Sequence, residues 1–192
     1  MKAIYPSHTE DAMVDTKFPY QIVIFTQDHS ISGGLFLHEQ RFSDFLNDRR
    51  DTTIMLRNAS VARLEDPAKI IEKSPISIIP KAGLVLAFEP PQKTTPQGRQ
   101  YIKYPKQKYD VFLAMDNLEV HGKLNVQGPL NLRTAITNMS ESFIPITEAV
   151  VALKANPKLI IKREAVLVNV QRIRFIGELQ PAAPAEEKGP GQ

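Results

Sequence analysis

The 192-residue chain contains two segments that repeat each other at a nearly constant spacing. Residues 20–37 align with residues 109–126 at an offset of 89, which places Gly33 on Gly122. One extra residue then enters the second segment, and at an offset of 90 the stretch DPAKII falls on NPKLII. Alternating apolar residues alone would make two β-rich segments look alike, but they would not also align the glycines and prolines. The sequence therefore predicts a tandem duplication.

Hydrophobic alternation within each copy predicts short β-strands. The stretch VHGKLNV (120–126) places apolar residues and a glycine on one face and polar residues on the other, as in a strand with one wet face. About five such strands fit each copy, and the third is expected to bend near Asn58 and Glu148. Five short strands laid flat bury little apolar surface, whereas closure removes their edges. The sequence therefore predicts a mainly β fold of two tandem five-stranded small β-barrels.

A short helical turn is expected after the second strand of each copy. In the stretch RFSDFLN, Phe42, Phe45 and Leu46 supply an apolar side. Ser43 is the expected N-cap, and Asp44 suits the first turn of the helix. One turn of helix is not stable alone, so packing against the barrel must hold it.

The remaining segments have the composition of connections and tails rather than of folded units. We divide the chain into an extended N-terminal segment (1–19), a first barrel repeat (20–90), a basic linker rich in Pro and Gln (91–108), a second barrel repeat (109–179) and a disordered tail (180–192).

The stretches VHGKLNV and VLVNVQRIRFI resemble the second strand and the closing strand-turn-strand of Sm-like small β-barrels, which have SH3-like architecture. The resemblance covers both repeats and implies two Sm-like units. The chain is also similar to bacterial domains of unknown function that carry an SDFLN-type turn. It departs from the Sm pattern because it has no obvious N-terminal helix. It also carries a helical turn where Sm proteins keep their Asp and Asn RNA-contact motif.

Composition narrows the class of protein. Hydrophobic residues make up 42% and charged residues 23% of the chain, which is ordinary for a soluble globular protein. The absence of cysteine excludes disulfides, thiolate metal sites and a cysteine nucleophile. No apolar run approaches the roughly 20 residues that span a bilayer, and the N-terminus carries acidic residues where a signal peptide is apolar. We expect a soluble, cytoplasmic protein without a membrane span.

Residues suited to catalysis or metal binding do not form a recognisable pattern. None of the histidines stands at a metal-ligand spacing with carboxylates, and Ser43 with Asp44 is better explained as a helix cap than as a catalytic pair. The four histidines are His8, His29, His38 and His121. We therefore expect no enzymatic activity, no metal, no cofactor and no evident small-molecule ligand.

The basic linker is the stretch that most suggests a partner, because it holds five basic residues, no acid and two interleaved tyrosines. Basic charge with aromatic rings can bind single-stranded nucleic acid by phosphate contact and stacking. The possible contacts for an anionic partner are Lys93, Arg99, Tyr101, Lys103, Tyr104, Lys106 and Lys108. The alternative is a plain connection whose tyrosines pack between the barrels.

Three functions remain open on the sequence. A non-catalytic protein-interaction or assembly scaffold would use its strand edges to pair with a partner strand, and the two repeats would form a pseudo-symmetric platform or part of a ring. The alternative is an Sm-like RNA-binding protein that uses the basic linker and the barrel loops. That alternative predicts salt-dependent binding weakened by Lys103→Glu and Lys106→Glu. The third is a ligand sensor or hydrolase with an unrecognised site.

Overall fold

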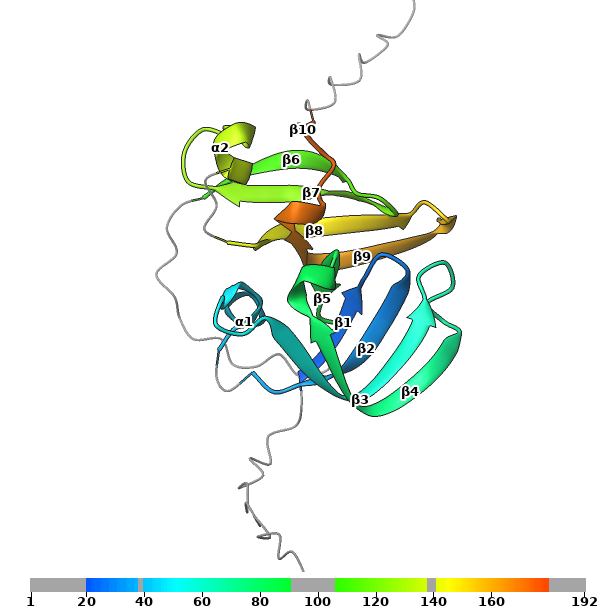
Figure 1. The fold of residues 1–192 in the computed structure, drawn as a ribbon. Coiled ribbons are helices and arrows are strands. Elements are labelled where there is room, and N and C mark those ends of the chain that lie inside the picture. Colours follow the sequence, from blue (N-terminus) through cyan, green and yellow to red (C-terminus); the bar gives the residue numbers. More distant parts are fainter. Residues whose placement is uncertain (1–19, 38–39, 91–105, 138–140, 180–192) are drawn as a thin grey trace, which may run out of the picture.

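The computed structural model describes residues 20–37, 40–90, 106–137 and 141–179, and its first half (20–90) and second half (106–179) follow the same order of elements (Figure 1). The first half contains β1 (Tyr20–Phe25), β2 (His29–Leu35), α1 (Phe42–Asn47), β3 (Thr53–Arg63), β4 (Ile70–Pro80), the 3-10 turn η1 (Lys81–Gly83) and β5 (Leu86–Phe88). The second half contains β6 (Gln107–Ala114), β7 (Leu118–Val126), α2 (Leu132–Thr137), β8 (Phe143–Leu153), β9 (Asn156–Asn169), the 3-10 turn η2 (Val170–Arg172) and β10 (Phe175–Glu178).

The ten strands form one antiparallel sheet with the order β10-β6-β7-β8-β9-β5-β1-β2-β3-β4. Within the first half the order is β5-β1-β2-β3-β4, and within the second it is β10-β6-β7-β8-β9, so the two halves have the same topology. They meet where β5 pairs with β9. The prediction of a mainly β fold is confirmed.

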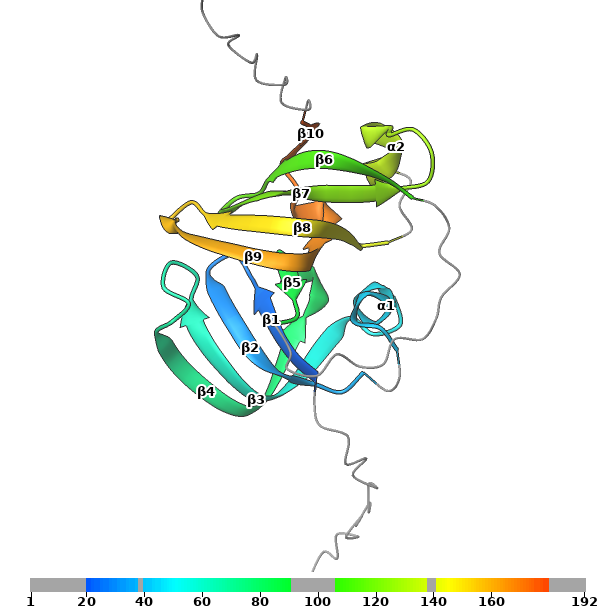
Figure 2. The ribbon, with the colours of Figure 1, turned by 180° about the vertical axis from the view of Figure 1, so that it is seen from behind.

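The prediction of two closed five-stranded barrels is not confirmed, because the sheet formed by the described strands is not closed. The reason lies in β5, which has β1 on one side and β9 on the other and so has no edge left to complete a first barrel. The strands instead curve as two stacked groups joined at that pairing (Figures 1 and 2). The ends of the sheet are β4 and β10.

The third strand of each half carries a bulge at the predicted bend. Asn58 and Glu148 both have φ of 50°, and the pairing of each strand with the one before it shifts register there. A bulge of this kind adds one residue to one strand and increases its twist. Gly33 and Gly122 lie opposite the bulges, and a Cβ at either position would meet backbone atoms of the bulged strand. The aligned glycines therefore permit the same close approach in both halves.

The hydrophobic core consists of two clusters, one under each half. The first is centred on β1, β3 and α1 and includes Phe143 and Leu167 from the second half. The second is centred on β6, β7 and β8 and includes Phe25, Leu86 and Phe88 from the first half. Each core therefore takes side chains from the opposite half where the two halves meet.

The N-cap of α1 differs from the prediction, and α2 has a side-chain cap for which no prediction was made. Arg41, not Ser43, occupies the N-cap of α1, because the helix begins at Phe42 after the extended backbone of Arg41. The Ser43 hydroxyl donates to the Asp44 carboxylate at 3.3 Å instead. In α2, Thr134 N donates to Asn131 Oδ1 at 3.0 Å, which is a side-chain cap that the sequence analysis missed.

Several predicted connecting segments lie outside the described residues. These are the N-terminal segment 1–19, linker residues 91–105 and the tail 180–192. Strand β6 begins at Gln107, so the last two residues assigned to the linker belong to a strand.

Candidate protein-interaction surface

Most of the predicted contacts for an anionic partner lie outside the described residues. This applies to Lys93, Arg99, Tyr101, Lys103 and Tyr104. Lys106 is exposed and immediately precedes β6. Lys108 lies within β6, and its Nζ donates to Glu148 Oε1 at 3.1 Å, with both side chains more than half exposed.

Lys108 belongs to a small network of exposed charges across β6, β7 and β8. Glu148 is also 3.6 Å from Lys123 Nζ, which in turn is 3.5 Å from Asp110. The hydrogen bond from Lys108, followed by the charge of Lys123, holds the pKa of Glu148 below its ordinary value. A phosphate group would have to compete with Glu148 for Lys108, although exposed pairs of this kind contribute only about 0–1 kcal/mol.

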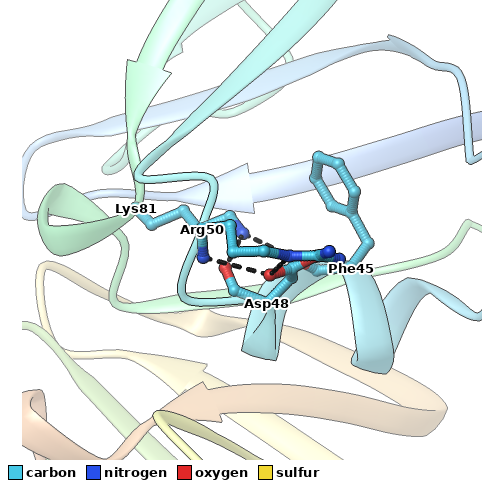
Figure 3. Close-up of polar contacts among 4 residues, drawn as sticks. All are labelled: Phe45, Asp48, Arg50 and Lys81. Atoms are coloured by element: carbon cyan, nitrogen blue, oxygen red, sulfur yellow. Dashed lines mark hydrogen bonds and ion pairs between the residues drawn. The ribbon is translucent and has the colours of Figure 1, made fainter.

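A buried lysine closes the C-terminal end of α1 (Figure 3). Lys81 is only 7% exposed, and its Nζ donates to Phe45 O at 2.6 Å and to Asp48 O at 3.0 Å. The ammonium group also lies 4.7 Å from the centroid of the Phe45 ring. Burial lowers the pKa of Lys81, and the charges of Asp51 and Asp48 act in the opposite direction. Because a cation at a helix C-terminus satisfies the last carbonyls, Lys81 stabilises a helix that has no side-chain N-cap.

The turn after α1 is fixed by a second interaction in the same cluster. Arg50 donates through Nε to Asp48 Oδ1 at 3.0 Å and through Nη2 to Asp48 Oδ2 at 2.6 Å (Figure 3). The Arg50 backbone N–H also donates to Asp48 Oδ1 at 3.0 Å. These hydrogen bonds hold the pKa of Asp48 well below its usual range. Lys81, Arg50 and Asp48 therefore stabilise α1 and the turn that follows it.

The junction between the halves is a short antiparallel pairing of β5 with β9. Leu86 lies opposite Val168, and Ala87 lies opposite Leu167. Leu86, Ala87 and Val168 are 0% exposed, and Leu167 is 7% exposed. The four paired residues of the fifth strand of one half and the fourth strand of the other are therefore buried at this junction.

Two asparagines reinforce this junction. Asn169, at the end of β9, donates through its backbone N to Val85 O at 3.0 Å and through Nδ2 to Leu84 O at 2.9 Å. Asn47, at the end of α1, donates through Nδ2 to Phe143 O at 2.9 Å and accepts from Phe143 N at 2.8 Å. The side chain of Asn47 thus satisfies the backbone at the start of β8 and attaches α1 to the opposite half.

The two ends of the sheet expose apolar side chains, whereas those at the junction are buried. Seven of the eight exposed large hydrophobic residues in the described part of the chain lie on or beside β4 or β10. They are Met55, Ile70, Ile71, Ile76 and Ile78 at the β4 end, and Phe175 and Leu179 at the β10 end. These exposed apolar residues are gathered at the ends of the sheet rather than scattered over its surface, which makes the ends candidate interaction surfaces.

The β4 edge is apolar on its outer face. Met55 lies opposite Ile78 in the pairing of β3 with β4, and Ile76 follows on the same face because side chains alternate along a strand. These three side chains are 48%, 59% and 53% exposed, respectively. We call Met55, Ile76 and Ile78 the β4 patch.

Sequence reasoning missed both the junction and the β4 patch. The signal for the patch was present in the stretch SPISIIP, where Ile78 and Ile79 are adjacent and therefore lie on opposite faces of the strand. Ile79 is 7% exposed and faces the core, so Ile78 must face outward. The junction had no comparable signal, because a partner strand 80 residues away does not affect local alternation.

Within the described ranges, no three His, Asp or Glu side chains are grouped so that they could hold a metal ion. None of the helices in the same ranges has the length and apolar character needed to cross a membrane. Comparison of the chain with protein families, with curated proteins and with solved structures finds no significant match.

Proposed function

We propose that the chain is a non-catalytic protein-interaction and assembly module, built from two Sm-like, SH3-like units, that binds an extended strand of a protein partner along β4. The single observation that carries this proposal is the concentration of exposed isoleucines on one end strand of the sheet. A strand that ends a sheet offers its backbone to a further strand, and apolar side chains beside it supply affinity.

The backbone of β4 supports pairing at this edge. Lys81 N donates to Thr52 O at 2.8 Å, so these two residues form a hydrogen-bonded pair at the end of β3 and β4. Hydrogen-bonded and non-hydrogen-bonded pairs alternate along an antiparallel ladder. Ile76 and Ile78 therefore direct their backbone N–H and C=O groups away from β3, towards the open side of β4.

The contacts of the polar groups support a non-catalytic role. Lys81 donates to two backbone carbonyls, Asp48 accepts from Arg50, and Ser43 donates to Asp44. Each group satisfies local structure, as capping and turn residues do. The RNA-binding alternative has weaker support, because the Lys108 ammonium is paired with Glu148.

The test compares affinity purification of the tagged full chain with that of two variants. Ile78→Lys places a charge in the β4 patch, and Ile160→Lys places the same charge at a 46% exposed isoleucine of β9, outside the sheet ends. We expect protein partners to be recovered with the wild-type chain and with Ile160→Lys but to be lost with Ile78→Lys. Recovery of the same partners with all three proteins would contradict binding at β4.

A further inference from the structure

The strands at the two ends of the sheet correspond to the two strands that pair at the junction between the halves. It joins the fifth strand of the first half, β5, to the fourth strand of the second half, β9. The strands left at the ends of the sheet are the fourth strand of the first half, β4, and the fifth strand of the second half, β10. Each end of the molecule therefore presents the counterpart of one side of its own junction (Figure 1).

The correspondence can be followed residue by residue at the β4 end. Leu167 in β9 lies opposite Pro145 in β8, and Ile78 in β4 lies opposite Met55 in β3. Met55 and Pro145 are separated by the same offset of 90 that relates the two halves. Ile78 is therefore the counterpart of Leu167, and Ile79 is the counterpart of Val168.

The β10 end follows the same logic. Leu86 in β5 lies opposite Phe25, and Phe175 in β10 lies opposite Ala114. Phe25 and Ala114 are separated by the offset of 89. Phe175 is thus the counterpart of Leu86, and Ile176 is the counterpart of Ala87.

Residues that are paired in the junction are buried, whereas their counterparts at the unpaired ends of the sheet are exposed. Leu86 and Leu167, which lie in the junction, are 0% and 7% exposed, whereas Phe175 and Ile78, at the ends of the sheet, are 56% and 59% exposed. A second copy of the chain carries the complementary strand for each end, with apolar side chains on both surfaces. The occupant that fits both ends at once is therefore this chain itself.

We propose that copies of this chain associate head to tail, with β10 of one copy pairing with β4 of the next in the register of the junction. Phe175 then lies opposite Ile79 of the neighbouring copy, and Ile176 lies opposite Ile78. This proposal rests on the proposed function and names its partner. Because the contact is heterologous, every added copy presents a new free β4 and a new free β10. The assembly therefore grows as an open chain or closes into a ring.

One residue makes contact between chains weaker than the junction. The counterpart of Asn169 is Pro80, which has no backbone N–H and no side-chain amide. The bonds that Asn169 makes to Val85 O and Leu84 O are therefore absent between copies. Association is expected to depend on concentration. Pro80→Asn is expected to strengthen it about tenfold, the effect of one net hydrogen bond of ~1.4 kcal/mol.

The experiment is sedimentation velocity of the full chain over a range of concentrations, with circular dichroism to verify folding. The wild-type chain and Ile160→Lys should show rising sedimentation coefficients, and Pro80→Asn should do so at lower concentration. Ile78→Lys and Phe175→Lys should each remain monomeric, because each lacks one side of the contact.

Mixing the last two variants tests the direction of pairing. Ile78→Lys keeps an intact β10 and Phe175→Lys keeps an intact β4, so an equimolar mixture should form a 1:1 dimer and nothing larger. A wild-type chain that stays monomeric at every concentration would overturn the proposal, as would a dimer of Phe175→Lys alone, since that dimer needs β4 to pair with β4. If the wild-type chain is monomeric while Ile78→Lys still loses another protein partner, the proposed function stands and self-association fails. If neither association nor Ile78-dependent capture is observed, both fail.

Discussion

The bulge shared by the two halves leads to a prediction about two equivalent glycines. A Cβ on Gly122 would lie 2.6 Å from Ile146 Cγ2 and 2.8 Å from Thr147 O, and the second of these is a backbone atom that cannot move aside. A Cβ on Gly33 would lie 3.1 Å from its nearest atom, Arg57 O. The same substitution to alanine is therefore expected to have different effects at positions that the repeat makes equivalent.

The size of each effect follows from two opposing contributions. Overpacking of a well-packed site costs about 1–3 kcal/mol, and the contacts place Gly122→Ala near the upper value and Gly33→Ala near the lower one. Replacing glycine by alanine also stabilises a protein by roughly 0.4–1 kcal/mol, because the unfolded chain loses freedom. We expect Gly122→Ala to lower the free energy of unfolding by about 2 kcal/mol and Gly33→Ala to change it by less than about 0.5 kcal/mol.

Urea denaturation followed by far-ultraviolet circular dichroism measures both values, and it suits a chain without tryptophan. The slope of the free energy against urea should be unchanged in both variants, since neither alters the surface exposed on unfolding. Equal losses of unfolding free energy at the two positions, or a Gly122→Ala protein as stable as the wild type, would contradict the claim that the backbone approaches Gly122 more closely than Gly33.

Three further predictions concern α1 and its attachments. Lys81→Met leaves two carbonyls without their donor and is expected to lower the free energy of unfolding by about 2–3 kcal/mol in urea denaturation. Asn47→Ala removes both hydrogen bonds to the backbone of Phe143 and is expected to cost about 1–3 kcal/mol in the same assay. Because Arg50 holds the pKa of Asp48 below its ordinary value of 3.8, the ionised carboxylate stabilises the fold above that value and this contribution is lost as pH falls through the folded pKa. Asp48→Asn should therefore make the free energy of unfolding less dependent on pH in this acid range.

Two of these predictions, for Lys81 and for Asp48, have a comparison variant. Lys106→Met changes the same side chain at an exposed position and should leave stability unchanged. Equal losses for Lys81→Met and Lys106→Met would contradict the capping role of Lys81. Arg50→Met should reproduce the pH effect of Asp48→Asn, and an Arg50→Met protein with the wild-type pH profile would show that Arg50 does not act on Asp48.

The sequence predicted those features of the fold that local patterns determine. The offset of the repeat correctly related the two halves, and the residues expected at the bends, Asn58 and Glu148, are those with positive φ. Alternation is visible in strands such as β3 and β8, which bury one face. The N-cap of α1 was predicted wrongly at Ser43, because serine is a frequent N-cap and nothing in the sequence showed that the helix begins two residues earlier.

The arrangement of the two halves could not be predicted from the same patterns. Closure into barrels was expected because it removes sheet edges, but pairing β5 with β9 also covers two edges. Closed barrels and the pairing of β5 with β9 require the same alternation of apolar residues, since Leu86 and Val168 are buried in either arrangement. Which strand pairs with β5 depends on contacts between distant segments, such as Asn169 with Leu84. The exposed ends of the sheet, and hence the proposed interaction surface, follow from that choice.

Cysteine cross-linking tests head-to-tail pairing most directly, because the chain has no cysteine of its own. Residues directly opposite each other in an antiparallel pair are ~4.5–5.5 Å apart at Cα, which is within the range that a disulfide can bridge. A mixture of Ile78→Cys and Ile176→Cys proteins should form a disulfide-linked 1:1 dimer under mild oxidation, faster than a mixture of Ile160→Cys and Ile176→Cys. Equal rates in the two mixtures, or no cross-linked dimer, would contradict the pairing of β10 with β4.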